Sequence, residues 1–385
     1  MSTKINVLQV IPKLSYGGAE TGCYDIAHYL AEKECGSFIA TASGELLKFV
    51  KKEKVKIFRL PVHSKNPILI IFNVLALSLF IILFKINIVH ARSRAPAWSC
   101  YLACFLTRRV FVTTFHGTYN FKSKFKKFYN SIMLRAKLTI AGSNFIFSHI
   151  NENYSEYLSK EKKLRVIFRG INVDYYNQKN ISILKQEKLK KEWGLTSNKF
   201  VILMPGRLTY WKGQEKFIES LNILIEDYNF TNFEAIILGS DQGRTVYKKK
   251  LINLVERYNL SKKIKFISHC KEMPLAYSLA DTVVSASIEP EAFGRVAVEA
   301  QSMGKLIIAS NIGGSKETIL NKKTGFLYEF DDPRELAKIL NTAIQLTQEE
   351  LNSMGNEGRK NITKKFDVET MCDTNLNEYK KLLKN

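Results

Sequence analysis

Short apolar runs alternate with helical stretches along almost the whole chain, and this alternation constrains the fold more than any other feature. Seven strand-like runs are expected in the first half, at 5–11, 37–42, 56–61, 86–92, 110–117, 138–143 and 164–170. Six more follow, at 200–208, 233–240, 263–270, 282–287, 306–310 and 325–330. Helical patterns lie between several of these runs, as at 96–106 and 121–136. Because alternating strands and helices form parallel sheets with helices on both faces, we expect an α/β fold with doubly wound sheets.

The length of the chain favours two domains. A single core rarely organises 385 residues, and the series of strands restarts after a polar, lysine-rich stretch at 172–198. We interpret this stretch as an interdomain connection with a short helix. The expected domains are therefore 1–175 and 176–366, followed by a helical tail at 367–385 that could pack back on the N-terminal domain.

The composition is strongly basic. The chain has 58 Lys and Arg against 36 Asp and Glu, a formal net charge of +22. Such a balance implies an acidic partner: nucleic acid, anionic lipid or a phosphorylated substrate. Nucleic acid is not the expected partner, because the sequence has no zinc-finger, homeodomain or RNP-type pattern. A general lysine bias could explain part of the excess.

The cysteines indicate a reducing compartment and no metal site. Six cysteines are scattered along the chain without a C-x-x-C pair, and no His/Cys group has the spacing of zinc ligands. Scattered cysteines in a chain of this size are typical of the cytoplasm. The first apolar run is short and leads into a glycine loop, so it predicts a first strand rather than a signal peptide.

One apolar stretch raises the question of a membrane. Residues 67–84 read PILIIFNVLALSLFIILF, close to the ~20 apolar residues that a spanning helix needs. Asn73 and Ser78 interrupt the stretch, and a strand follows it directly. A span would separate consecutive elements of one sheet, so we expect a buried helix or one that lies at a membrane interface. Insertion into the membrane remains open.

The segment EPEAFGRVAVEAQSMGK lies between two apolar strands and carries Glu291 and Glu299 eight positions apart. Glu291 is expected in the loop and Glu299 about one turn into a helix, with Gly294 at the corner. A helix N-terminus at such a corner offers backbone N–H groups to an anion. Two acceptor carboxylates beside a phosphate site suit a ligand with both hydroxyls and phosphates, such as a nucleotide sugar. For either glutamate alone, capping of a surface helix is the alternative.

Basic residues and glycines follow other strands of the second half. Arg207 and Lys212 lie in the loop after 200–205, between Gly206 and Gly213. Arginine offers a rigid fork and lysine a mobile charge to phosphate oxygens, so the pair suits a diphosphate. Further glycine loops follow the next strands, with Gly239 in one of them and Gly313 and Gly314 in another. Several such loops at one sheet edge are typical of a nucleotide site.

Two features of the first half point to the corresponding edge of its sheet. Gly17 and Gly18 form the turn between the first strand and the first helix, where glycine allows close approach of a ligand. The dinucleotide fingerprint G-x-G-x-x-G is absent. His116 follows the strand at 110–115, a position from which a histidine can bond to a sugar. Both features have ordinary structural explanations as a turn and a loop residue.

These residues together resemble the retaining glycosyltransferases of family 4, which have the GT-B architecture. EAFGRVAVEA matches the E-x7-E signature of that family, and GRLTYWKG resembles its segment for the donor phosphates. SYGGAE and FHG fall where the family has its glycine loop and its histidine. HARSRAPAWSCYLA at 90–103 further resembles bacterial enzymes that build cell-surface glycans and lipopolysaccharide. The resemblance implies two Rossmann-like domains that face each other across a cleft.

The resemblance also implies roles for residues of the second domain. Arg207 and Lys212 would bind the diphosphate and stabilise its charge as the sugar leaves. Glu291 would bond to hydroxyls of the transferred sugar, and Glu299 to those of the ribose. Phe293, Gly294 and Arg295 would present backbone N–H groups to the sugar or phosphate, and Gly239 lies at the donor site.

In the first domain, the resemblance places Gly17 and Gly18 near the donor phosphates and His116 at the donor sugar or its oxocarbenium-like transition state. Catalysis would need no metal and no cofactor beyond the co-substrate, a UDP-, GDP- or ADP-sugar. The segment LGSDQGR lacks the common G-x-G-P form of the family, and Ser268 stands where glycine is frequent. Both segments border the nucleotide base in that family, so the resemblance does not assign the base.

We therefore expect a retaining, metal-independent hexosyltransferase that acts at the inner face of the cytoplasmic membrane as a peripheral protein. Its acceptor would be lipid-linked or a lipopolysaccharide core, its partners a nucleotide sugar, a glycan acceptor and an anionic membrane surface. The alternatives are a soluble transferase with a small-molecule or protein acceptor, and a non-catalytic nucleotide-sugar-binding protein. The sequence does not identify the sugar, the base or the acceptor.

Overall fold

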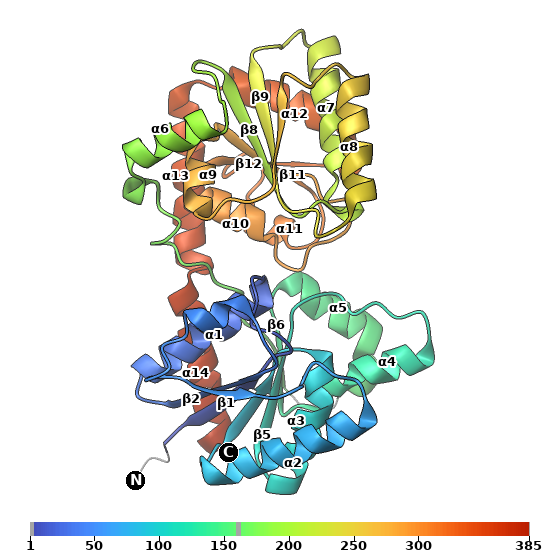
Figure 1. Cartoon of the computed structure of the whole chain (residues 1–385), viewed down its shortest axis with the longest axis vertical. Coiled ribbons are helices and arrows are strands. Elements are labelled where there is room, and N and C mark those ends of the chain that lie inside the picture. The colour runs from blue at the N-terminus through green and yellow to red at the C-terminus, as the bar shows by residue number, and fades with distance from the viewer. Residues whose placement is uncertain (1–3, 159–162, 385) are drawn as a thin grey trace. The chain divides into compact units, whose positions relative to one another are not determined.

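Two parallel sheets organise the chain into two compact units (Figure 1). The computed structural model describes residues 4–158 and 163–384. The N-terminal unit contains residues 1–170 and 368–385, and the C-terminal unit contains residues 171–367. The division falls at 170/171 and 367/368, whereas the sequence placed it at 175/176 and 366/367. The expected α/β class with two doubly wound parallel sheets is confirmed.

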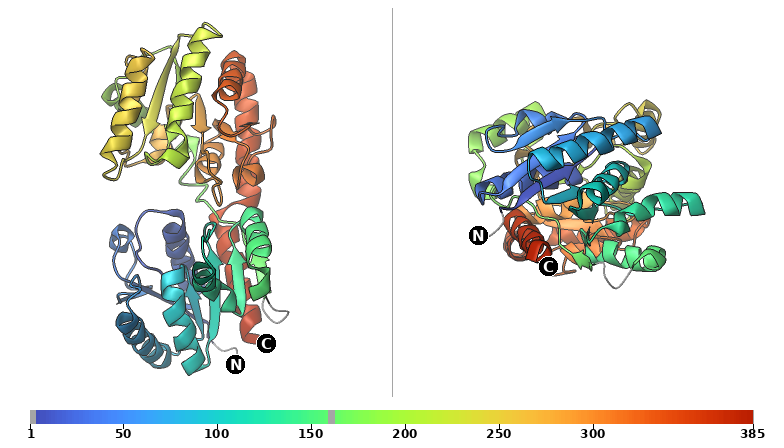
Figure 2. Two further views of the ribbon diagram at one scale, coloured as in Figure 1. Left: turned by 90° about the vertical axis from the view of Figure 1, so that its right-hand side faces the viewer. Right: turned by 90° about the horizontal axis from the view of Figure 1, so that it is seen from below.

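The N-terminal unit has a seven-stranded sheet in the order β3-β2-β1-β4-β5-β6-β7, with every neighbouring pair parallel. Helices cover both faces of this sheet (Figure 2). Its strands are β1 (Asn6–Val10), β2 (Gly36–Thr41), β3 (Lys56–Arg59), β4 (Ile88–Ala91), β5 (Val110–Phe115), β6 (Leu138–Ala141) and β7 (Lys163–Val166). Its α-helices are α1 (Gly18–Glu32), α2 (Pro67–Leu83), α3 (Arg94–Thr107), α4 (Lys124–Ser131), α5 (Asn144–Tyr154) and α14 (Val368–Lys384).

The C-terminal unit has a six-stranded parallel sheet in the order β10-β9-β8-β11-β12-β13. Its strands are β8 (Phe200–Pro205), β9 (Phe233–Leu238), β10 (Ile264–Ile267), β11 (Thr282–Ser285), β12 (Leu306–Ser310) and β13 (Phe326–Tyr328). Its α-helices are α6 (Ile183–Glu192), α7 (Gln214–Glu226), α8 (Thr245–Arg257), α9 (Met273–Ser278), α10 (Arg295–Ser302), α11 (Ser315–Thr318), α12 (Pro333–Gln345) and α13 (Gln348–Lys365).

All thirteen apolar runs expected as strands form strands. The inner strands are buried on both faces of the parallel sheets, whereas the edge strands β3 and β7 carry no fully buried side chain. The helical pattern at 121–136 is shorter than expected: α4 ends at Ser131 and a 3₁₀ turn continues to Arg135. The apolar stretch at 67–84 forms α2, which is 17 residues long. Across residues 4–158 and 163–384, no helix combines the length and apolar character that a membrane crossing requires.

The lysine-rich stretch at 172–198 belongs to the C-terminal unit and does not form a free connection. Its Tyr176 is buried, and its carbonyl oxygen accepts hydrogen bonds from Ser302 Oγ at 2.9 Å and Arg359 Nη1 at 2.8 Å. Helix α6 continues the segment and donates from Gln186 Nε2 to the carbonyl of Ser278 at 3.0 Å. The stretch also buries four apolar or aromatic side chains, those of Tyr176, Leu189, Trp193 and Leu195. They are spread among polar residues, so the composition concealed this docking.

The last helix, α14, packs into the core of the N-terminal unit. Leu376 and Tyr379 of α14 lie in one buried cluster with Val7, Ile88 and Val112 of the sheet. The Tyr379 hydroxyl lies 2.6 Å from His90 Nδ1, and Thr114 Oγ1 lies 2.7 Å from His90 Nε2. Burial, and then the charge of Arg92, hold the pKa of His90 well below its usual range. The neutral ring therefore needs one donor and one acceptor, which the two hydroxyls supply.

We predict that Tyr379→Phe destabilises the N-terminal unit, because it leaves a buried ring nitrogen of His90 without its partner. The free energy of unfolding should fall by about 1–3 kcal/mol. Urea-induced unfolding followed by circular dichroism measures this change. Tyr16→Phe is the matched control, since the Tyr16 side chain is 69% exposed. Equal unfolding free energies for the two variants would contradict the prediction.

Candidate functional site

The loops after β8 and β11 meet at one edge of the C-terminal sheet. The two strands are hydrogen-bonded neighbours and run in the same direction. Their carboxyl ends therefore lie at the same edge, where ligands bind in open α/β sheets. The loop after β8 ends in a short 3₁₀ turn at Tyr210–Lys212, and the loop after β11 leads into α10. Residues far apart in the sequence are brought together here.

Lys212 and Glu291 form a close ion pair at this edge. Lys212 Nζ donates to Glu291 Oε1 at 2.7 Å, and both side chains are mostly buried, at 11% and 13% exposed. The Ser287 hydroxyl donates to the same carboxylate oxygen at 2.5 Å. Two donors converge on one oxygen, so the carboxylate is held in a fixed position. A buried charge requires such partners, because desolvation of an unpaired ion is costly.

The electrostatic surroundings keep Glu291 ionised. Burial by itself would raise the pKa of this carboxyl. The charge and hydrogen bond of Lys212, the Ser287 hydroxyl and the charge of Arg207 outweigh burial and hold the pKa below its usual value. At neutral pH the group is therefore an acceptor of hydrogen bonds and not a proton donor.

Gly213 allows the two loops to approach each other. Its φ of 72° lies in the left-handed region, and a Cβ at this position would lie 1.8 Å from the carbonyl oxygen of Ala286. Gly239, directly after β9, lies against Gly206 in the same way. Gly314 lies against the backbone of Phe293, and its N–H donates to the carbonyl of Glu291 at 2.7 Å. The loop that carries Glu291 is thus fixed from two sides by glycine contacts.

Arg207 lies beside this pair but has a different environment. Its side chain is exposed, and its guanidinium lies 6.0 Å from the centre of the Trp211 ring. Lys212 Nζ lies 4.5 Å from the same ring. Gln214 Nε2 donates to the carbonyl of Arg207 at 2.9 Å and fixes the backbone of the loop. Both cations therefore lie near the ring of Trp211.

Helix α10 begins directly after the Glu291 loop. Gly294 is its N-cap and has φ 74°, while Phe293 is buried. As a glycine, Gly294 has no side chain with which to cap this end. Arg295 is the first residue of the helix, and its Nε donates to Glu299 Oε1 at 2.6 Å, four residues further on. The charge of Glu299 is the main cause that raises the pKa of Arg295.

Glu299 is held by a set of donors separate from those of Glu291. Its two oxygens accept hydrogen bonds from the Tyr176 hydroxyl at 2.9 Å and the Tyr277 hydroxyl at 2.7 Å, in addition to Arg295. The glutamate itself is 6% exposed. Burial, together with the nearby negative charge, raises the pKa of both tyrosines well above its usual range. They therefore remain donors to the carboxylate at all physiological pH values.

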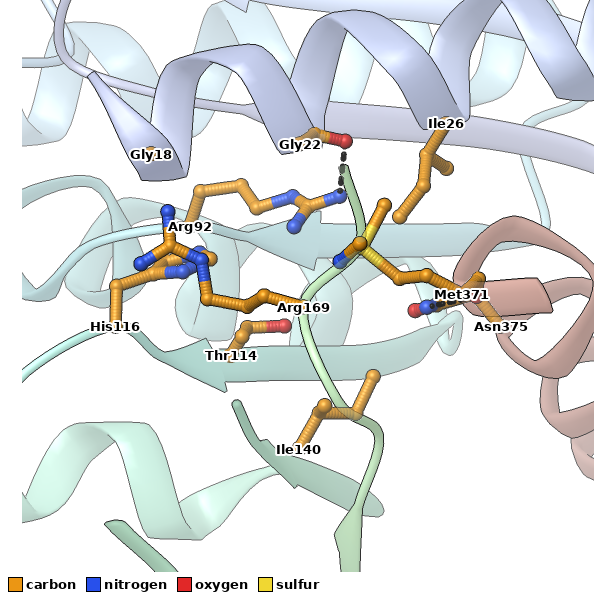
Figure 3. Close-up of a pocket in the computed structure, with 11 residues that line it drawn as sticks. Gly18, Gly22, Ile26, Arg92, Thr114, His116, Ile140, Arg169, Met371 and Asn375 are labelled. Carbon is orange, nitrogen blue, oxygen red and sulfur yellow. Dashed lines mark hydrogen bonds between the residues drawn. The ribbon is translucent and has the colours of Figure 1, made fainter. Parts of the chain in front are cut away.

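The N-terminal unit presents its own constellation at the carboxyl edge of its sheet (Figure 3). Gly17 is the N-cap of α1, and Gly18 is the first residue of that helix. A cavity of about 20 Å³ lies between α1, the ends of β4 and β5, and α14. His116, Arg92 and Arg169 line it together with Gly18. The volume has room for about one water molecule.

Arg92 is buried at this cavity and contacts neutral groups. Its Nε and Nη2 donate to Gln9 Oε1 at 3.0 and 2.6 Å, and Nη2 also donates to the carbonyl of Gly22 at 3.2 Å. Within the part of the chain that the structure describes, no ion pair involves Arg92. The guanidinium of Arg169 lies against Gly18. The lining of this cavity is therefore positively charged.

His116 follows β5 and is neutral. Both ring nitrogens are buried and have no hydrogen-bond partner among the described residues. Burial, and then the charges of Arg92 and Arg169, hold the pKa of His116 well below its usual range. An imidazole in this state can donate one hydrogen bond and accept another.

The structure brings together some of the residues singled out from the sequence and adds others. Lys212 and Glu291 are in contact, whereas Glu299 is bound to a different group of donors. Sequence reasoning missed Ser287, which reaches Glu291 from four positions earlier, because a serine in an apolar run carries no signal. It also missed the two tyrosines of Glu299 and the buried Arg92. Only Arg92 had a usable signal, its position just after the strand β4.

Comparisons with known proteins agree with this geometry. Residues 185–361 match a family described as glycosyl transferases group 1, and residues 16–175 match one described as glycosyltransferase family 4. The crystal structure of a glycosyltransferase from Rickettsia africae ESF-5 is 36% identical, with a TM-score of 0.91 over 99% of both chains. HepE of Anabaena, solved with UDP and glucose, is 24% identical, with a TM-score of 0.81 over 97% of this chain and 99% of its own.

A further relative is the capsular polysaccharide biosynthesis glycosyltransferase CapM of Staphylococcus aureus. It is 25% identical over 370 residues, which cover 91% of this chain and 93% of CapM. Both halves of the sequence and both sheets are thus accounted for by one group of enzymes. The chain belongs to the family 4 glycosyltransferases and has their GT-B fold.

Proposed function

We propose that this protein is a retaining hexosyltransferase that moves a sugar from a nucleoside diphosphate sugar to a lipid-linked or lipopolysaccharide-core acceptor. It would act at the cytoplasmic face of the membrane. The observation that carries the proposal is the Lys212–Glu291–Ser287 network at the strand edge, directly before the N-terminus of α10. This network combines a cation for phosphate with a fixed carboxylate for sugar hydroxyls.

In this proposal the diphosphate binds beside Arg207 and Lys212. Arg207 has an exposed guanidinium, and Lys212 is positioned by Glu291 so that its charge is preorganised. The backbone N–H groups at the start of α10 add a partial positive charge. Preorganised donors of this kind stabilise charge that develops on a leaving group. The reaction then proceeds without a metal ion.

Glu291 and Glu299 would bind two different parts of the donor. Glu291 is ionised and accepts hydrogen bonds, which suits the hydroxyls of the transferred sugar. Glu299, oriented by two tyrosines and Arg295, suits the ribose hydroxyls. HepE has been solved with UDP and with UDP-glucose, which supports a UDP-sugar as the first donor to test.

The chemical step would retain the anomeric configuration. The bond from the sugar C1 to the phosphate oxygen breaks, and a bond from C1 to the acceptor oxygen forms on the same face. The acceptor proton passes to the departing phosphate, and the nucleoside diphosphate leaves. The scheme of retaining glycosidases, with a nucleophile and an acid about 5 Å apart, does not fit. Glu291 is held ionised by Lys212, and Glu299 is bound by its own donors.

The acceptor is proposed from the relatives and from the surface of the protein. CapM is named for capsular polysaccharide biosynthesis, and the segment at 90–103 resembles enzymes that build cell-surface glycans. Such glycans are assembled on lipid carriers or lipid cores. The basic composition suits the anionic membrane in which these acceptors lie.

The first test is a thermal-shift panel of UDP-, GDP- and ADP-sugars on the whole chain. A donor at about 100 times its Kd should raise the Tm of the unit that binds it by about 5–10 °C. The stabilising donor is then incubated with a membrane lipid extract, with and without a chelator, and release of nucleoside diphosphate is measured. Donor binding is wrong if no nucleotide sugar raises the Tm.

We predict that Glu291→Gln lowers kcat/KM by about 100-fold, because it removes the charge that positions Lys212 and contacts the sugar. Lys212→Gln should have an effect of similar size. In the double variant the losses should not add, since the two residues act as one unit. Glu289→Gln is the control, as this neighbouring acid is exposed and should leave kcat/KM unchanged. Additive losses would contradict the shared role.

We predict that His116 stays neutral between pH 6 and 8, because burial and two guanidinium charges oppose its protonation. Its Cε1–H signal in NMR spectra should therefore not shift over this range. The signal is assigned by its disappearance in His116→Asn. A shift with a midpoint near pH 6.5 would show that the ring is solvated and charged.

A further inference from the structure

The N-terminal unit exposes a large apolar surface on three neighbouring helices. Twelve large apolar side chains of α2, α3 and α4 are each between 41% and 79% exposed. We call this set the α2–α4 surface. Its members are Ile68, Ile71, Phe72, Leu75, Leu79, Ile82 and Leu83 of α2, Leu102, Phe105 and Leu106 of α3, and Phe125 and Phe128 of α4. Exposed apolar patches of this extent mark interaction sites in soluble domains.

Helix α2 is apolar on both of its faces. On the inward face, Leu77 and Ile81 are fully buried, and Phe80 stacks on Phe58 of the edge strand β3 with ring centres 4.0 Å apart. The outward residues recur at the three- and four-residue spacing of one helix face, for example Ile71, Leu75 and Leu79. Packing on the sheet accounts for the inward face only. The outward face is the part of α2 that the fold does not explain.

The three helices form one continuous surface. Helices α2 and α3 lie side by side in Figure 1, and Ser99 Oγ of α3 lies 3.5 Å from the carbonyl of Ile70 in α2. Trp98 of α3 packs on Phe128 of α4 with ring centres 5.8 Å apart. The guanidinium of Arg135 lies 5.5 Å from the Phe128 ring and ties the same helices together. The exposed apolar side chains therefore lie on helices that pack against one another.

The charged side chains of these three helices and of the loops between them are all basic, although Lys127 of α4 pairs with Glu156 at 2.6 Å. From residue 54 to residue 151 the sequence contains no Asp or Glu, while it contains fifteen Lys and Arg. This stretch includes the whole of α2, α3 and α4. Exposed cations flank the apolar side chains at the ends of the helices and between them: Lys65, Lys85, Arg108, Arg109, Lys122, Lys124 and Lys126. An apolar surface with this border is complementary to anionic lipid.

We infer that the α2–α4 surface docks the protein on an anionic lipid bilayer, with α2 lying in the plane of the interface. This inference rests on the proposed function, which requires a lipid-borne acceptor. A protein partner or a second copy of the chain would bury the apolar side chains but would not call for a border so rich in cations, since all 36 acidic residues of this chain lie outside 54–151. The inward face of α2 stays on the sheet, so the helix does not cross the bilayer.

In the docked arrangement, α2 lies at a defined depth in the bilayer and the exposed apolar side chains face the lipid. An interfacial helix buries its apolar face about 5–10 Å into the boundary between head groups and acyl chains. Phe105 and Phe125, at 73% and 79% exposed, would enter the boundary with α2. The cations at the helix ends would remain among the head groups, where long basic side chains reach outward.

The test is co-sedimentation of the whole chain with vesicles of phosphatidylglycerol and phosphatidylcholine at increasing salt. An apolar variant carries Ile71→Ser, Leu75→Ser and Leu79→Ser, and a charge variant carries Lys122→Gln, Lys124→Gln and Lys126→Gln. Each should lower the partition coefficient by about 100-fold. The wild-type protein should be released as salt rises, and it should bind vesicles of phosphatidylcholine alone only weakly.

Matched controls lie in the C-terminal unit. Ile183→Ser, Leu184→Ser and Val246→Ser remove exposed apolar side chains, and Lys188→Gln, Lys191→Gln and Lys249→Gln remove exposed charges. These variants should bind vesicles like the wild type. Equal binding by the surface variants and their controls would overturn the inference. The inference would also be overturned if the wild type formed a dimer at micromolar concentration and only the apolar variant were monomeric.

Failure of the docking surface and failure of the proposed function give different results. Stabilisation by a nucleotide sugar is measured on every variant, and the surface variants should keep it. Loss of vesicle binding with full donor stabilisation supports the inference. Vesicle binding by a protein that no nucleotide sugar stabilises would remove the proposed function and leave the docking surface in place.

Discussion

Parallel pairing of strands is the constraint on which the chemistry of this protein depends. In a parallel sheet all carboxyl ends lie at one edge, so loops that are distant in the sequence become neighbours. Strand β11 pairs with β8, and this single pairing brings Glu291 to Lys212 across 79 residues. The same rule places His116 and Arg92 together in the N-terminal unit, because β4 pairs with β5. Each constellation exists because of sheet order rather than sequence proximity.

The charged groups at the C-terminal edge are explained better by binding than by stability. A mostly buried ion pair gains little free energy, since desolvation of both groups offsets their attraction. The Lys212–Glu291 pair is nevertheless supported by Ser287, and the surrounding loops are fixed by glycine contacts at Gly213 and Gly314. Glu299 likewise accepts hydrogen bonds from the hydroxyls of two tyrosines. Such support would preorganise these charges for the proposed donor, which carries phosphates and hydroxyls.

The fold could be predicted from the sequence because its signals are local and repeated. Every strand of a parallel sheet is a short apolar run, and glycine marks the turns that approach one another. The partners within the site were not predictable, because they depend on side chains that carry no pattern. Ser287 lies in an apolar run, and Tyr277 belongs to a helix of six residues. Tyr176 lies in a polar stretch whose sequence predicts an interdomain connection. In the structure, hydrogen bonds to Ser302 and Arg359 hold this stretch against the rest of the C-terminal unit.

The distribution of charge is more informative than its total. The proposed donor site at the C-terminal edge would use two cations, Arg207 and Lys212, whereas fifteen Lys and Arg without a single acid lie between residues 54 and 151. At physiological salt a charge acts over about 8 Å, so these residues affect only what lies directly against the N-terminal unit. A small phosphorylated donor needs few of them. An extended anionic surface would contact many of these cations at once. The apolar helix α2 beside them would add a hydrophobic contact that holds the protein on that surface.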